Sequence, residues 1–315
     1  RPVPRVTRSA TGSGPAPGVA VRAGLHDDLG YAVPLTSAPR RVVSLVPSLT
    51  EAIAVSAPGV LVGATDWCVH PEGLAVTRVR GTKNPDLEAI TALAPDLVVA
   101  NEEENREADV RALRARGIAV WVTDIRSVAT ALTSIERVLD LLAAPERDWL
   151  ARARAAWGIG HAGATAQTNR AGEAKKPSRP GLTSGAGETA YPPVVATAVI
   201  AIWRRPWMFL GRETYAGDVL RRLGVANALG THEQRYPRVD PAQLPPHDLV
   251  VLPDEPYPFA PGDGPEAFPA ARTVLVDGQA LTWYGPRTVQ AADRLADALR
   301  DAAVPLDPRF GGSAI

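Results

Sequence analysis

Polar and aromatic side chains gather in the loops that follow predicted strands, where a ligand site would form. Four of the seven tryptophans of the chain, Trp67, Trp203, Trp207 and Trp283, lie in these loops. Tryptophans on loops favour stacking walls for a large flat ligand, because each presents a broad apolar face. The loops concerned are 65–71, 81–84 and 101–106 in the first half, and 203–207, 234–237, 255–257 and 282–285 in the second.

Charged residues in the same loops predict contacts with the polar groups of that ligand. Arg204, Arg205 and Arg235 are suited to carboxylate or phosphate groups, which guanidinium binds with paired hydrogen bonds. We therefore predict a binding site without catalytic residues. The predicted ligand-binding residues are Trp67, Lys83, Glu103, Arg106, Trp203, Arg204, Arg205, Trp207, Arg235, Tyr236, Tyr257, Trp283 and Tyr284.

Cys68 and His70 form a pair whose side chains both bind zinc or copper. Two ligands do not complete a metal site, and the glutamates at 102–104 are only hypothetical additions. The alternative is that Cys68 is a small buried side chain. The glutamates could also form an acid/base pair, but without an opposing partner we expect a solvated loop. Ser48, followed by Glu51, is expected to form a capping box at a helix start.

Short β-branched runs alternate with helical segments, which predicts parallel sheets with flanking helices. The run 94–103 closely resembles 246–255, and aspartates recur about 153 residues apart, as Asp96 and Asp248 do. We predict two copies of one α/β unit. Predicted strands are 41–46, 97–100, 119–123, 197–203, 249–252 and 273–276; predicted helices are 107–116, 127–142, 145–157, 215–223 and 287–303.

Composition narrows the class of protein. The 315 residues carry 34 Lys+Arg and 34 Asp+Glu, so the basic excess of a general nucleic-acid binder is missing. One cysteine excludes an intrachain disulfide and a multi-thiolate metal site. No apolar run is long enough to span a membrane. A signal peptide and a lipid-attachment cysteine are not visible, so an extracytoplasmic location requires a removed leader, and the alternative is the cytoplasm.

The low-complexity segments set the expected domain limits. Two Rossmann-like α/β lobes are predicted, bridged by a long backbone helix, with a ligand cleft between them. We expect a monomer with this organisation: a disordered extension at 1–26, a first lobe at 27–125, the bridging helix at 126–157, an insertion at 158–193, a second lobe at 194–303 and a tail at 304–315.

Several motifs resemble the vitamin B12-binding, BtuF-like branch of ABC-transporter solute receptors, the helical-backbone metal receptors. They are the run 41–51 (RVVSLVPSLTE), Val62-Gly63, 86–90 (DLEAI) and 94–98 (APDLV). The resemblance covers about 27–303 without the insertion. It implies a cleft ligand, little hinge closure, and corrin contacts by Trp67, Trp207, Tyr236 and Trp283.

The resemblance also implies docking on a permease through one glutamate in each lobe. Glu88 occupies the first position, whereas Ala242 stands at the second. We therefore expect a non-catalytic receptor for a metal complex, most simply a corrinoid, with no intrinsic cofactor. The alternatives are a ferric-siderophore or haem receptor, and a cytoplasmic metal-handling protein that uses Cys68 and His70.

Overall fold

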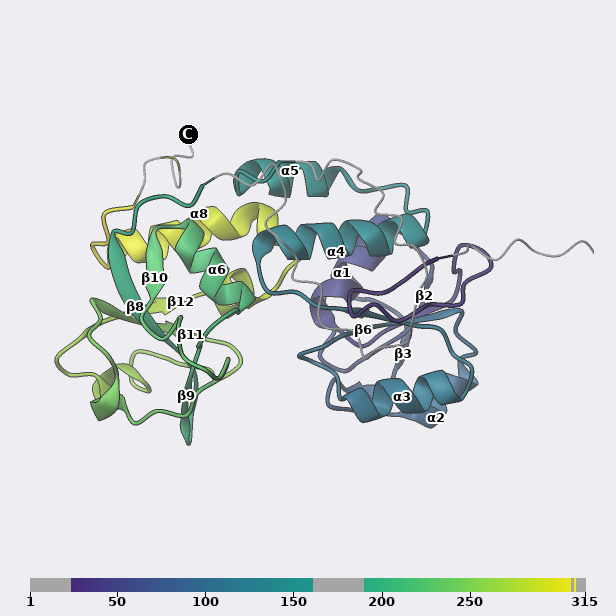
Figure 1. The fold of residues 1–315 in the computed structure, drawn as a ribbon, viewed down its shortest axis with the longest axis horizontal. Coiled ribbons are helices and arrows are strands. Elements are labelled where there is room, and N and C mark those ends of the chain that lie inside the picture. Colours follow the sequence, from purple (N-terminus) through teal and green to yellow (C-terminus); the bar gives the residue numbers. More distant parts are fainter. Residues whose placement is uncertain (1–23, 161–189, 307–308, 310–315) are drawn as a thin grey trace, which may run out of the picture.

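The computed structural model describes residues 24–160, 190–306 and 309, and it has two α/β lobes side by side (Figure 1). Most of the predicted extension at 1–26, insertion at 158–193 and tail at 304–315 lies outside these residues. Helices α4, α5 and α8 run along one side of the pair of lobes, and the turn that leads into β9 lies at the opposite side. The predicted two-lobed α/β class is confirmed.

The first lobe is built on a parallel sheet in the order β3-β2-β1-β6-β7. All residues of β1, β6 and β7 are buried, as expected for a parallel sheet covered on both faces. The strands are β1 (Val42–Ser44), β2 (Leu61–Ala64), β3 (Thr77–Arg78), β6 (Leu97–Asn101) and β7 (Val120–Thr123), with a small pair β4 (Arg80–Gly81) and β5 (Asn84–Pro85); the helices are α1 (Pro47–Ser56), α2 (Leu87–Ala92) and α3 (Glu107–Ala115).

The second lobe repeats this plan with the parallel order β10-β8-β11-β12, while β9 pairs antiparallel with the end of β8. β8 therefore extends beyond the parallel sheet as one arm of a hairpin. The strands are β8 (Ala196–Arg204), β9 (Trp207–Phe209), β10 (Val225–Asn227), β11 (Leu249–Pro253) and β12 (Arg272–Val276); the helices are α6 (Tyr215–Arg222), η1 (Pro241–Gln243), η2 (Pro265–Ala267), α7 (Gly278–Thr282) and α8 (Thr288–Asp301).

The two lobes use the repeated aspartates in the same way, which confirms the predicted duplication. Asp96, just before β6, accepts hydrogen bonds at 2.9 Å from the main-chain nitrogens of Arg40 and Arg41. Asp248, just before β11, accepts one at 2.6 Å from the nitrogen of Thr197. Each aspartate thus ties the start of one central strand to its neighbour.

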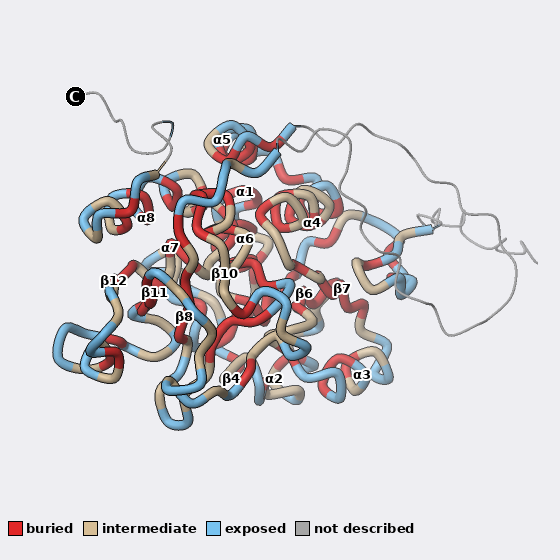
Figure 2. Tube along the Cα trace, turned by 60° about the vertical axis from the view of Figure 1, so that its left-hand side comes forward, coloured by how far each residue is buried: buried red, intermediate tan, exposed pale blue. Residues whose placement is uncertain are grey.

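The bridging segment contains two helices, α4 (Val128–Leu141) and α5 (Asp148–Ala156). The helix predicted at 126–157 is therefore interrupted, and Ala143 adopts a positive φ of 48° in the break. Ser127 caps α4 through a reciprocal bond with Thr130. One apolar core runs through α1, α4, α5 and α8 and joins the lobes, and buried residues (red in Figure 2) concentrate in the strands and inner helix faces.

The capping box predicted at Ser48 is wrong. The N-cap of α1 is Val46, with no side-chain cap, and Pro47 supplies the first turn with a preset φ. Glu51 instead forms an ion pair across the lobes, with 3.0 Å between its Oε2 and Nε of Arg287. Within the described residues, no helix is long and apolar enough to cross a membrane.

Candidate functional site

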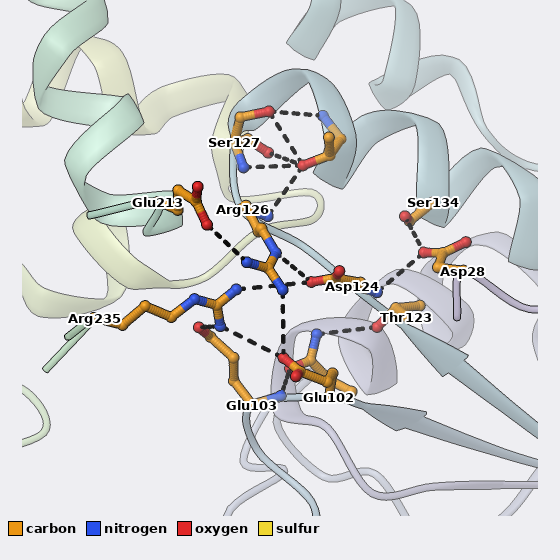
Figure 3. A network of polar contacts seen from close by, with 12 residues as sticks. Asp28, Glu102, Glu103, Thr123, Asp124, Arg126, Ser127, Ser134, Glu213 and Arg235 are labelled. Carbon is orange, nitrogen blue, oxygen red and sulfur yellow. Dashed lines mark hydrogen bonds and ion pairs between the residues drawn. The ribbon is translucent and has the colours of Figure 1, made fainter. Parts of the chain in front are cut away.

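Acidic and arginine side chains from the two lobes meet between the lobes (Figure 3). Glu103, after β6, accepts a hydrogen bond from the hydroxyl of Tyr236 at 2.9 Å and pairs with Arg235. Glu102 lies 3.4 Å from the same guanidinium. The partners come from opposite lobes, so these contacts bridge the cleft.

Arg126 joins the same network from the start of the bridging segment (Figure 3). Its Nε donates to Asp124 at 2.7 Å, and its Nη1 donates to Glu213 of the second lobe at 3.0 Å. A further ion pair of 3.9 Å connects it to Glu102. We call the whole network the interlobe cluster: Glu102, Glu103, Glu104, Asp124, Arg126, Arg235, Tyr236 and Tyr284.

Glu104 is the most deeply buried acid of the interlobe cluster. Burial raises the pKa of Glu104 to about 7, against the lowering effect of a 3.0 Å hydrogen bond from the hydroxyl of Tyr284. Burial likewise raises the pKa of Glu103, although Arg235 opposes the shift. The solvated loop expected for the three glutamates is therefore wrong, because all three contact side chains of the second lobe.

Two buried asparagines fix the loop that carries the glutamates. The side-chain oxygen of Asn101 accepts hydrogen bonds from the nitrogens of Glu103 at 2.9 Å and Glu104 at 3.3 Å. Asn105 donates to the carbonyl of Thr82 at 2.9 Å, which ties the loop to the neighbouring turn. Asn101 directly follows the apolar strand predicted at 97–100 and ends β6 in the structure, and that position is the sequence signal for its role.

In the second lobe, Arg235 and Tyr236 are positioned through the main chain. The nitrogen of Gly211 donates to the carbonyl of Arg235 at 2.7 Å, and that of Phe209 donates to Pro237 at 3.0 Å. A Cβ at Gly211 would lie 2.1 Å from the carbonyl oxygen of Gln234. Only glycine allows this approach, so Gly211 sets the place from which Arg235 reaches the first lobe.

Trp67 and Lys83 lie beside the interlobe cluster on the first lobe. The Trp67 side chain is 66% exposed, although the residue follows a buried strand. A Cβ on Gly81 would lie 3.5 Å from Nε1 of Trp67, and Lys83, two residues further, donates to the carbonyl of Glu103. The structure therefore brings Trp67, Lys83 and Glu103 to one surface. Arg106 is exposed and pairs with Asp109 of α3 at 2.8 Å.

The predicted residues of the β8–β9 hairpin form a second group. Trp203 is 41% exposed and meets Tyr257 edge-on at 5.6 Å, while Tyr257 donates to Asp263 at 2.7 Å. Arg204 pairs with Asp263 and Glu266. Arg205 is exposed at the turn of the hairpin.

Trp207 is packed differently from the other predicted aromatic residues. Its ring stacks on Phe259 at 5.8 Å and on Phe209 at 6.0 Å, and meets Phe268 edge-on at 5.1 Å. The guanidinium of Arg204 lies over the Trp207 ring, 5.7 Å from its centre. Trp207 thus belongs to the apolar core of the second lobe, so its removal would test folding as much as binding.

Cys68 and His70, the predicted pair of metal ligands, contact different parts of the protein. Cys68 is buried, accepts a hydrogen bond from Thr50 at 3.0 Å and lies 3.1 Å from the hydroxyl of Thr65. Burial raises the pKa of the Cys68 thiol, which disfavours the thiolate that binds metal. The His70 ring packs edge-on against Trp283 of the second lobe at 5.5 Å. Across 24–160, 190–306 and 309, no group of three His, Cys, Asp or Glu residues is arranged to hold a metal.

A cavity of about 790 Å³ lies between the lobes on the flank formed by α6 and the start of α4. It is lined by residues of both lobes, but none of the thirteen predicted ligand-binding residues lines it. Asp124 and Arg126 line this cavity and also belong to the interlobe cluster, and sequence reasoning missed both as site residues, although they follow the strand predicted at 119–123. The lining includes Asp28, Asp124, Arg126, Glu213, Asp218 and Asn227.

Sequence comparison connects the chain with named receptors, although no protein-family model matches it. It is 30% identical over 189 residues to the "Vitamin B12-binding protein" of Salmonella choleraesuis (strain SC-B67), which covers 57% of this chain and 69% of the relative. It is 31% identical over 118 residues to YvrC of Bacillus subtilis (strain 168), an "Uncharacterized ABC transporter substrate-binding lipoprotein", covering 36% and 38%.

Solved structures show the same fold at lower identity. The periplasmic vitamin B12 binding protein BtuF of Vibrio cholerae superposes with a TM-score of 0.63 at 19% identity, over 84% of this chain and 98% of that one. The periplasmic heme-binding protein RhuT from Roseiflexus sp. RS-1 gives 0.60 at 21% identity, over 84% and 99%. With its duplicated lobes, bridging helices and sequence relatives taken together, the chain belongs to the vitamin B12-binding, BtuF-like family of solute-binding proteins.

Proposed function

We propose that this protein is a non-catalytic receptor that binds a corrinoid in the cleft between its lobes. The observation that carries the proposal is the exposure of Trp67 on one lobe and Trp203 on the other, both at the carboxyl ends of parallel strands. Large apolar rings exposed to water are suited to stacking on a flat macrocycle. The relatives named vitamin B12-binding proteins support a corrin as that macrocycle.

The interlobe cluster supports binding rather than catalysis. Glu103 and Glu104 accept hydrogen bonds from tyrosine hydroxyls, and Arg235 pairs with Glu103. Groups held in this way orient the polar edge of a ligand and need no proton transfer. The cobalt of a corrinoid would enter as part of the ligand, so the receptor itself requires no metal ligand.

Replacing Trp67 by alanine tests the proposal. Since the side chain is largely exposed, Trp67→Ala should leave thermal stability unchanged while it removes a stacking face worth roughly 1–2 kcal/mol. We expect the Kd for cyanocobalamin to rise about tenfold or more by isothermal titration calorimetry, and Trp67→Phe to retain most of the affinity.

Tyr31 offers a matched control, because it is 54% exposed on the same lobe and stacks with Arg114 at 4.4 Å. Tyr31→Ala should bind cyanocobalamin as the parent protein does. Equal affinities for the parent, Trp67→Ala and Trp203→Ala proteins would remove the stacking argument.

We propose an ABC permease as the partner, with Glu88 as a contact of the first lobe. Glu88 is 82% exposed at the start of α2 and pairs with Arg116 at 2.6 Å. The relative named as an ABC transporter substrate-binding lipoprotein supports this partner. At the corresponding place of the second lobe, Asp240 caps η1 by accepting from the nitrogen of Ala242 at 2.9 Å.

Charge reversal at Glu88 tests this contact. Glu88→Arg should lower corrinoid uptake by cells that depend on this receptor, while the Kd of the purified protein for cyanocobalamin stays the same. Glu107→Arg is the matched control, because Glu107 is 76% exposed on the same lobe and also forms an ion pair with an arginine, at 2.9 Å. Equal uptake with both variants would contradict the docking role of Glu88.

A further inference from the structure

The charged side chains between the lobes determine which metal complexes can bind, provided that the protein is the receptor proposed above. We propose that the interlobe cluster selects a complex whose periphery carries uncharged carboxamide groups, and that it discriminates against complexes whose periphery carries carboxylates. The charged groups of the cluster are the acids Glu102, Glu103, Glu104 and Asp124 and the cations Arg126 and Arg235. Glu213 and Lys83 contact the cluster from outside it.

The two arginines of the interlobe cluster are already neutralised by the protein. Arg235 pairs with Glu103 and Glu102 and lies 3.9 Å from Asp124. Arg126 is held between Asp124 and Glu213. A carboxylate on the ligand would have to displace one of these acids to reach a guanidinium, and the displaced acid would remain in the cleft as a like charge.

The other cations near the exposed tryptophans are held in two different ways, Lys83 by a main-chain carbonyl that leaves its charge in place and Arg204 by two acids. Lys83, beside Trp67, donates to the main-chain carbonyl of Glu103. Arg204, beside Trp203, pairs with Asp263 and Glu266. Arg205 lies at the exposed turn of the hairpin, where water and salt screen its charge. The guanidinium nearest to Trp203 in the hairpin is therefore already occupied by two acids.

Carboxamides suit this surface because they bring donors without adding negative charge. The side chains of Glu102 and Glu103 are 32% and 21% exposed, so both carboxylates lie in side chains that solvent partly reaches. An amide N–H donates to a carboxylate, whereas a second carboxylate is repelled by it. A corrin ring with amide side chains satisfies this requirement, and a porphyrin with free propionates does not.

One chemical change on the ligand isolates this selectivity. Hydrolysis of a single corrin side-chain amide of cyanocobalamin gives monocarboxylic acids of nearly the same shape. We would measure the Kd of cyanocobalamin and of each separated monocarboxylic acid isomer by isothermal titration calorimetry at pH 7.5 and 50 mM salt. At least one isomer should bind tenfold or more weakly than cyanocobalamin. Because salt screens charge repulsion, 500 mM salt should reduce this ratio of Kd values several-fold.

Glu102→Gln should also bring the Kd of that isomer closer to the Kd of cyanocobalamin, because it removes a negative charge from the most exposed acid that faces Arg235. The control is Glu107→Gln, on the outer surface of α3, which should leave the ratio of Kd values unchanged. If every isomer binds within twofold of cyanocobalamin, or more tightly, the proposed selection against carboxylates is wrong, whereas the proposed corrinoid-binding function is unaffected. If cyanocobalamin itself does not bind, the proposed function fails instead, so the two failures are distinguishable.

Discussion

The two lobes share a topology but differ in where their acidic strand ends find partners. After β6, Glu103 and Glu104 reach the tyrosines of the opposite lobe. After β11, Asp254 accepts from the nitrogen of Gly278 at 2.7 Å and Glu255 from Gln279 at 3.0 Å, both within their own lobe. The repeated acids therefore have different roles, because α7 approaches β11 closely whereas the loop after β6 faces the cleft.

Breaking a contact across the cleft should cost far more than breaking its counterpart within a lobe. Arg235→Ala removes the cation that Glu102 and Glu103 share, and we expect it to lower the free energy of unfolding by roughly 3–5 kcal/mol. Gln279→Ala, which removes the partner of Glu255, should cost about 1 kcal/mol. Urea unfolding of both variants measures the difference, and equal losses would contradict the contrast between the lobes.

The pH dependence of stability sharpens the comparison at Glu104. Its pKa rises from 4.5 to about 7 on folding, so the folded protein binds more protons than the unfolded chain between these values. The stabilisation from this group is therefore full below pH 4.5 and is lost as the pH rises through 7. Glu104→Gln, which keeps an acceptor for Tyr284, should be more stable than the parent at pH 8 by up to roughly 3 kcal/mol.

The gain from Glu104→Gln should shrink toward pH 5, where the parent carboxyl is protonated. Urea titrations of both proteins between pH 5 and 8 give the two curves. Glu255→Gln is the control from the second lobe, and its difference from the parent should not follow this trend. Parallel curves for the parent and Glu104→Gln proteins would mean that Glu104 is ionised in the folded protein throughout this range.

The smallest effect is expected where the lobes touch through the main chain. Gly285 adopts a φ of +128°, and a Cβ there would lie 3.1 Å from the carbonyl of Ser48 in the first lobe. Gly285→Ala should lower the free energy of unfolding by about 1–2 kcal/mol, which thermal unfolding shows as a lower melting temperature. Gly262→Ala has open space around it and should cost less than 0.5 kcal/mol. A cost as small for Gly285→Ala would show that the lobes shift without penalty.

The elements of the fold were predictable because their signals are local. Buried strands such as 97–100 are short apolar runs, and Asp96 and Asp248 mark the duplication. The capping prediction at Ser48 failed because Pro47 begins the helix without a side-chain cap. A Ser-x-x-Glu pattern does not distinguish that start from a capping box.

The candidate site was only partly predictable, because its contacts join residues that are distant in sequence. Glu103 and Tyr236 are 133 positions apart, and no periodic pattern connects them. Residue type pointed to both as ligand contacts, but only the structure shows that they bind each other. The flank cavity was missed because Asp124 and Arg126 follow a strand without the aromatic neighbours that marked the other loops.

The most direct measurement is a titration of the ligand-free protein with cyanocobalamin, followed by calorimetry and by tryptophan fluorescence corrected for inner-filter absorption. A corrinoid receptor that stacks its ligand on exposed tryptophans should bind one equivalent per chain with a submicromolar Kd, and fluorescence should be quenched in the same range. No saturable heat and no quenching at a hundredfold higher cyanocobalamin would contradict the account, and haem would then be the next ligand to titrate.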